Sequence, residues 1–164
     1  MNPTRGGWVV LLSLLVAMVL AVFHLPESWP AWLGVLRPNW LLLVLFFWVM
    51  EIPHRLGLFV AYLMGLVVDA LLAEPLGLNG IIFAGVTFVT WSFFERLRMY
   101  SVLQQAGVVF ALVAGAELLR MGVLSLDSSR DMGWLWLATA LVTALLWPVV
   151  YLLLLKIRTT VRVE

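Results

Sequence analysis

Long apolar segments with few polar interruptions dominate the pattern of hydrophobic and polar positions along this chain. The first segment, residues 8–23, has the sequence WVVLLSLLVAMVLAVF, in which Ser13 is the one polar side chain. The strands of a membrane β-barrel would instead alternate apolar and polar positions over short segments. Continuous apolar runs of this length are typical of helices that cross a membrane. The pattern therefore predicts an all-α membrane protein.

The apolar runs predict a bundle of six transmembrane helices in a single domain that covers residues 1–164. We expect these helices at residues 8–25, 39–52, 56–73, 78–94, 102–124 and 133–155. Pro38 suits the first turn of the short second helix, and residues 29–36 before it either lie in the membrane interface or partly re-enter the bilayer. Pro148 predicts a kink in the last helix. The first helix is expected to be retained, because no signal-peptide cleavage site follows it.

Composition supports lipid as the surrounding solvent. Of the 164 residues, 64% are hydrophobic and 12% are charged, whereas a soluble domain is about 25% charged. The chain has no cysteine, which excludes disulfides, thiolate metal sites and cysteine nucleophiles. A net charge of +1 is too small to indicate a nucleic-acid partner.

The basic residues predict the orientation of the bundle. Seven lie on the side that carries both termini: Arg5, Arg55, Arg96, Arg98, Lys156, Arg158 and Arg162. The loops of the opposite side carry two, Arg37 and Arg130. Because cytoplasmic loops are enriched in Lys and Arg, both termini are predicted to be cytoplasmic.

Three charged residues fall inside the predicted membrane segments: Asp69 in the third helix, and Glu117 and Arg120 in the fifth. A charge at the bilayer centre costs roughly 2.5–3.5 kcal/mol on insertion scales, so each is a candidate site residue. From their positions we expect all three about 6–10 Å below the outer surface. Arg120 can pair with Glu117 along its own helix, and with Asp69 if the two helices are neighbours. The cluster is then a structural ion pair, a ligand or proton site, or a contact with a partner helix.

Small residues form a stripe along the third helix. Gly57, Ala61 and Gly65 recur every four residues, and the stripe ends on Asp69. Small residues at this spacing let helix backbones approach closely in a membrane. The stripe is therefore expected either to pack against another helix of the bundle or to dock a partner helix.

Catalytic motifs are absent from the sequence. It contains no G-x-S-x-G, H-E-x-x-H or P-loop pattern, and its two histidines, His24 and His54, are too far apart for a close-spaced metal motif. The chain is accordingly expected to be neither an enzyme nor a cofactor-binding protein.

Several short motifs in the first half of the chain resemble those of the bacterial rod shape-determining MreD family. They are Arg37-Pro38-Asn39-Trp40, Pro53-His54-Arg55, Gly57, Gly65, Asp69 and Leu76-Gly77. The specificity lies in their order and spacing, and the resemblance extends over the whole chain in length, number of helices and basic tail.

The resemblance implies a non-enzymatic inner-membrane protein of the cell-wall elongation complex that maintains rod shape. It implies MreC as a partner, and a place beside the MreB filament, RodA and the transpeptidase partner of RodA. It also implies a six-helix bundle similar to the substrate-binding subunits of energy-coupling-factor transporters.

Two functional hypotheses follow. In the first, the bundle is a scaffold that docks MreC and helps to organise peptidoglycan synthesis. In the second, it is a small-molecule or lipid-binding membrane protein that resembles a transporter's substrate subunit, with Asp69, Glu117 or Arg120 lining an outward-open pocket.

Overall fold

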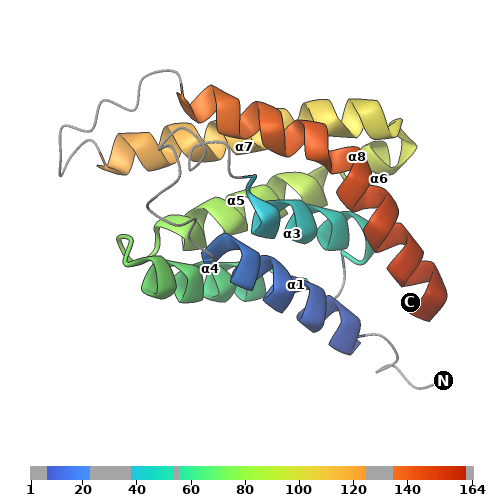
Figure 1. Cartoon of the computed structure of the whole chain (residues 1–164), viewed down its shortest axis with the longest axis horizontal. Helices are drawn as coiled ribbons and strands as arrows, with labels where there is room; N and C mark the ends of the chain where they lie inside the picture. Colours follow the sequence, from blue (N-terminus) through green and yellow to red (C-terminus); the bar gives the residue numbers. More distant parts are fainter. Residues whose placement is uncertain (1–6, 23–37, 54–55, 125–134, 162–164) are drawn as a thin grey trace, which may run out of the picture.

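The computed structural model describes residues 7–22, 38–53, 56–124 and 135–161, and their regular secondary structure is helical throughout. The first residues of α1 and the last residues of α8 lie at the same end of the bundle (Figure 1). The helices are α1 (Gly7–Val22), α3 (Trp40–Glu51), α4 (Leu58–Leu72), α5 (Leu78–Ser92), α6 (Phe94–Met99), α7 (Val102–Leu124) and α8 (Leu135–Val161).

Each predicted apolar segment overlaps one of these helices, and the bounds of α7 agree with the prediction at both ends. The last helix is longer than predicted, because α8 ends at Val161 and not at residue 155. No helix is predicted over residues 95–101, but α6 occupies most of that segment and follows α5 after one irregular residue, Phe93. The side chain of Leu97 is buried. The Nε2 of Gln105 donates to the carbonyl oxygen of Leu97 at 3.0 Å. A buried apolar anchor and a capped carbonyl thus hold this charged segment as a helix.

Three helical stretches are long and apolar enough to cross a membrane: Leu78–Met99, Val102–Leu124 and Trp136–Val161. The other apolar helices of the described chain, α1, α3 and α4, are shorter. The fold is therefore that of an apolar helical bundle, and six complete membrane passages remain a prediction.

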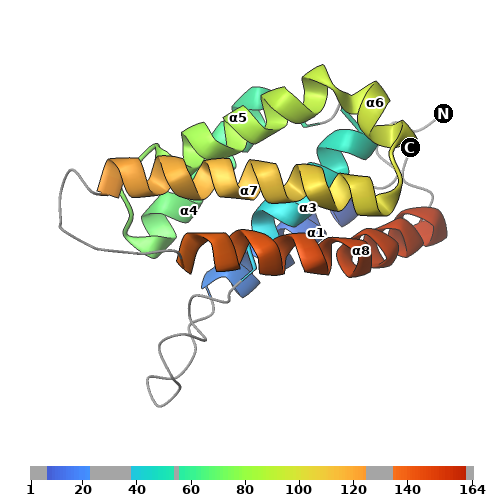
Figure 2. The ribbon, with the colours of Figure 1, turned by 90° about the horizontal axis from the view of Figure 1, so that it is seen from above.

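The shortest of these apolar helices, α3, forms the centre of the bundle (Figures 1 and 2). Its 12 residues extend for about 18 Å, and every side chain from Leu41 to Met50 is buried. It packs against α1, α5 and α8. A helix that is hydrophobic all round is stable only where other elements surround it, so the second predicted segment is the core of the bundle.

Helices α4 and α5 pack closely where Gly65 of α4 faces the backbone of α5 and Gly80 of α5 faces Tyr62 of α4. A Cβ atom on Gly65 would lie 2.5 Å from the carbonyl carbon of Asn79, and closer still to the backbone of Gly80. A Cβ atom on Gly80 would lie 2.9 Å from the ring of Tyr62. The overlap with backbone atoms requires glycine at position 65, whereas a side chain at position 80 would have to displace the Tyr62 ring.

Helices α7 and α8 lie side by side and form the second closely packed pair (Figure 2). The axis of α8 changes direction along its length (Figures 1 and 2). Pro148 lies inside this helix, where it cannot supply the N–H of a helical hydrogen bond, and the change of direction agrees with the predicted kink.

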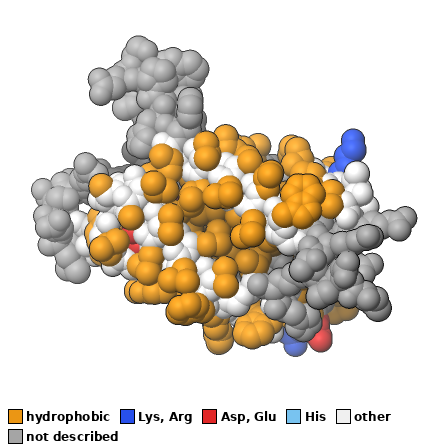
Figure 3. Space-filling model, turned by 90° about the horizontal axis from the view of Figure 1, so that it is seen from below, with side chains coloured by type: hydrophobic (Ala, Val, Ile, Leu, Met, Phe, Trp, Pro, Cys, Tyr) orange, Lys and Arg blue, Asp and Glu red, His pale blue; other side chains and the backbone are white. Residues whose placement is uncertain are grey.

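The outside of the bundle is apolar. Hydrophobic side chains cover most of the face that Figure 3 shows, and large exposed ones occur on several helices, among them Leu11, Phe59, Leu103 and Leu145. Contiguous apolar surface of this extent is expected where lipid, and not water, surrounds the helices.

Candidate functional site

The Asp69 carboxylate lies at the point where α4 ends and α5 begins, and it is fully buried. Its Oδ2 accepts a hydrogen bond from the backbone N–H of Gly77 at 2.7 Å. Its Oδ1 accepts from the backbone N–H of Asn79 at 3.0 Å and from the side-chain Nδ2 of the same residue at 2.8 Å. The first N–H groups of a helix have no partner within the helix and carry partial positive charge. Asp69 thus accepts hydrogen bonds from the unpaired N–H groups at the start of α5.

The turn between the two helices has the backbone geometry that these hydrogen bonds to Asp69 need. Ala73 ends α4 in the left-handed conformation with φ 53°, and Gly77 precedes α5 with φ 98°. The backbone N–H of Glu74 donates to the carbonyl oxygen of Asp69 at 3.0 Å, which closes the end of α4. Glycine adopts a positive φ without the steric cost that a Cβ atom would bring, so Gly77 can present its N–H to the carboxylate.

Asn79 connects Asp69 to the other charged residues of this site. Its Nδ2 donates to Glu74 Oε2 at 2.7 Å as well as to Asp69. Its Oδ1 accepts from Arg120 Nη2 at 2.6 Å. One buried amide on α5 therefore links α4, the turn after it, and α7. We call Asp69, Glu74, Asn79, Glu117 and Arg120 the polar network.

Arg120 has partners other than those expected from the sequence. Among the residues that the structure describes, its ion pair is with Glu74, at 3.6 Å between Nη1 and Oε1, and not with Glu117 or Asp69. Asn79 occupies the position between the guanidinium and Asp69, which explains the indirect link. The Nε of Arg120 is buried without a hydrogen-bond partner. Glu117 is buried on the preceding turn of α7, where the charges of Arg120 and Glu74 both act on it.

The polar network contains three carboxyl groups and one guanidinium. Its hydrogen bonds join three helices, so it can fix their relative positions or hold a proton. The sequence did not lead us to predict Asn79 and Glu74 as residues of this site. Asn79 could have been noticed as the strongly polar side chain in the first turn of an otherwise apolar segment.

A second charged cluster, Glu51 with Arg98 and Arg158, lies at the opposite end of the bundle. Glu51 is the last residue of α3, and its side chain is 7% exposed. It pairs with Arg98 of α6 at 3.4 Å and with Arg158 of α8. A carboxylate at a helix C-terminus is unfavourable unless cations compensate for it. An acidic residue at the end of an apolar segment was therefore a sign in the sequence that basic residues pair with Glu51.

The small-residue stripe lies largely inside the chain. Ala61 and Gly65 are buried, and Gly65 faces the backbone of α5. Gly57 precedes α4 with an extended backbone, φ −80° and ψ 162°. Among the described residues other than its chain neighbours, no atom lies within 4 Å of the position of a Cβ on it. The outward face of α4 is formed by larger side chains.

The remaining motif residues sit at the ends of helices. Asn39 caps α3, because its Oδ1 accepts from the N–H of Leu42 at 3.2 Å. Its backbone N–H donates to Thr143 Oγ1 of α8 at 3.1 Å. Pro38 precedes this cap, and Pro53 is buried after α3. Three further motif residues, Arg37, His54 and Arg55, lie outside the described residues.

Within the described ranges, no group of three or more His, Cys, Asp or Glu residues has an arrangement that could hold a metal ion.

Comparison with known proteins gives one family. The family model described as rod shape-determining protein MreD matches residues 3–157. The chain belongs to the MreD family. A curated MreD relative, the rod shape-determining protein MreD of Haemophilus influenzae, is 31% identical over 158 residues. That alignment covers 96% of this chain and 95% of the relative. No solved structure matches this MreD-family chain.

Proposed function

We propose that the chain is a non-enzymatic scaffold of the inner membrane that binds MreC and helps to organise peptidoglycan synthesis during cell elongation. The observation that carries the proposal is the match to a family of rod shape-determining proteins over residues 3–157, which supports a role in cell shape. In this proposal MreB, RodA and the transpeptidase partner of RodA belong to the same complex.

The distribution of polar groups supports a scaffold. Asp69, Asn79 and Arg120 form their hydrogen bonds within the chain, and Glu51 is engaged by two arginines at the other end. Helices fixed at both ends keep one shape, which favours the docking of a partner because less flexibility is lost on binding. A transmembrane partner would then meet the apolar outer surface.

We propose the outward face of α4 as the docking surface for the transmembrane helix of MreC. Phe59, Leu63, Val67 and Leu71 recur every four residues along this face and are exposed. They extend over about 18 Å of helix. The opposite face of α4 packs on α5, and the polar network holds its C-terminal end, so the outward face has a fixed position.

The test is co-purification with MreC, together with cell shape in a strain that has the variant as its one copy. Replacing both Leu63 and Val67 by tryptophan keeps the surface apolar but changes the shape that a partner helix must fit. We expect at least a tenfold loss of recovered MreC, and rounded cells. The matched control replaces Leu118 and Leu119, which are exposed on α7, by tryptophan as well. It should recover MreC and keep cell shape as the wild type does.

Two results would count against the proposal. Equal MreC recovery from the α4 variant and its α7 control would rule out the outward face of α4 as the docking surface. Failure of the wild-type chain to recover any MreC would remove the scaffold itself.

The second candidate function is that of a lipid-binding or small-molecule-binding membrane protein, similar to the substrate subunit of an energy-coupling-factor transporter. The observation that favours it is an apolar groove between α1 and α8, whose lining does not include Asp69, Glu117 or Arg120.

A further inference from the structure

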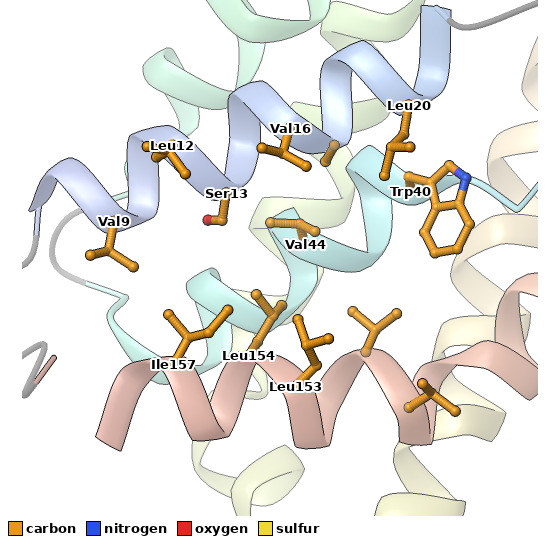
Figure 4. A pocket seen from close by; sticks show the side chains of 13 residues that line it. Val9, Leu12, Ser13, Val16, Leu20, Trp40, Val44, Leu153, Leu154 and Ile157 are labelled. Carbon is orange, nitrogen blue, oxygen red and sulfur yellow. The ribbon is translucent and has the colours of Figure 1, made fainter. Parts of the chain in front are cut away.

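An apolar groove with a volume of about 420 Å³ lies between α1 and α8, next to α3. Figure 4 shows the side chains that line it. One stripe of each helix forms a wall, and Trp40 and Val44 of α3 lie between the walls. The walls include Leu12, Val16 and Leu20 of α1, and Val149, Leu153 and Ile157 of α8.

The groove presents hydrocarbon and almost no hydrogen-bonding groups. Its one polar side chain is Ser13, whose hydroxyl already donates to the carbonyl oxygen of Val10 at 2.9 Å and accepts from Trp48 Nε1 at 2.8 Å. Val16 and Leu153 are at least half exposed, so the groove is open towards the surroundings of the bundle. Its occupant must therefore be apolar.

The volume of the groove distinguishes two apolar occupants. An apolar protein cavity of about 150 Å³ holds one benzene molecule, so 420 Å³ corresponds to roughly 17 carbon atoms, the size of one lipid acyl chain. A helix that filled the groove along α1 from Val9 to Leu20 would need a cylinder of roughly 1,300 Å³, from its diameter and its rise per residue. The enclosed space therefore matches a single acyl chain, whereas a helix would lie partly outside the groove.

The last turns of α8 carry an exposed cation next to a wall residue of the groove. Lys156 is exposed and adjoins Ile157, the last wall residue of α8. Within the described part of the chain no carboxylate forms an ion pair with it, whereas Arg98 and Arg158 nearby are both engaged by Glu51. Lys156 follows the wall residue Leu153 by three positions, so it lies one turn further along a neighbouring part of the same helix surface. Its exposed side chain is available there for an anionic group.

We propose that the groove between α1 and α8 holds one acyl chain of an anionic phospholipid, whose phosphate pairs with Lys156. The apolar walls bind the chain, and the cation selects the charge of the head group. This site is independent of the MreC surface on α4 and does not rest on the scaffold proposal.

Native mass spectrometry of the full-length chain in detergent tests the site, with equal amounts of phosphatidylglycerol and phosphatidylcholine of the same chain length. We expect the wild type to retain one phospholipid and to prefer phosphatidylglycerol. Replacing both Val16 and Leu153 by tryptophan fills the groove and should lower occupancy at least tenfold. The control replaces their neighbours Leu15 and Leu152, which are as exposed but do not line the groove, and should leave occupancy unchanged.

The Lys156→Gln variant tests the head group separately and does not alter the apolar walls. It should retain one lipid but bind both lipids equally. Equal lipid retention by the groove-filling variant and its control would overturn the acyl-chain site, and an unchanged preference in Lys156→Gln would overturn the head-group pairing. A photoreactive residue at position 16 that cross-links in cells to a polypeptide, and not to lipid, would overturn the proposal in favour of a partner helix.

Discussion

The Nη2 atom of Arg120 lies 2.6 Å from the Oδ1 of Asn79, and this contact joins α7 to α5. Because the Nδ2 of the same amide donates to Asp69 and Glu74, one asparagine connects the guanidinium to two carboxylates. The contribution of this contact to the stability of the bundle can be measured with variants of the two residues.

Replacing Asn79 by alanine should lower the free energy of unfolding by about 1–3 kcal/mol, because it leaves buried donors and acceptors unpaired. Hydrogen bonds between membrane helices have measured couplings that average about 0.6 kcal/mol and reach about 1.7 kcal/mol. For this buried and charged contact we expect the upper half of that range in a double-mutant cycle of Asn79→Ala with Arg120→Ala. The measurement is unfolding in detergent, followed by tryptophan fluorescence. Strictly additive single and double variants would show that the contact contributes nothing.

Gly65→Ala should weaken the packing of α4 on α5, since the added methyl group overlaps the backbone of Gly80 and Asn79. Backbone atoms cannot move aside as a flexible side chain would, so we expect a loss of at least about 2 kcal/mol, within the range for overpacked cores. The matched control is Gly85→Ala on α5, where nothing lies within 4 Å of the added atom. That change should be neutral, or stabilise the helix by up to about 1 kcal/mol. Equal unfolding midpoints for the two variants would rule out the close crossing.

The Glu51 cluster predicts a ranking of three arginines. Arg158, 28% exposed, pairs with a nearly buried carboxylate, whereas Arg98 is 44% exposed and its pairing is screened by its surroundings. Arg158→Gln should therefore cost about 1–3 kcal/mol, and Arg98→Gln about 0–1 kcal/mol. Arg96→Gln, an exposed position on the same short helix, should have no effect on the unfolding midpoint. A larger loss for Arg98→Gln than for Arg158→Gln would contradict Arg158 of α8 as the main partner of Glu51.

Much of the helical architecture could be predicted, because an apolar run too long for a strand has few alternatives to a helix. The bounds of α7 follow directly from the run at 102–124. The central place of α3 could not be predicted in this way, since an apolar segment looks the same whether lipid or protein surrounds it. Its short length and its lack of any polar face were the available signals.

The candidate site was predicted in part. Asp69 and Arg120 were singled out because charges are costly in a membrane segment, and the structure brings them to one end of the bundle. Asn79, which links them, carries no charge and did not attract notice. Its contact with Arg120 spans 41 positions in the sequence, so it depends on how α5 and α7 pack and not on any local spacing.

The scaffold proposal is tested most directly by disulfide cross-linking in native membranes, because the chain contains no cysteine of its own. Single cysteines at Leu63 and Val67 of α4 would be paired with single cysteines along the transmembrane helix of MreC, with Leu118 of α7 as the control position. We expect cross-links at both α4 positions, repeating with helical periodicity along MreC, and none at position 118. Cross-links at position 118 but not on α4 would contradict the docking surface, and no cross-link from any of the three positions would contradict the binding of MreC at these helices.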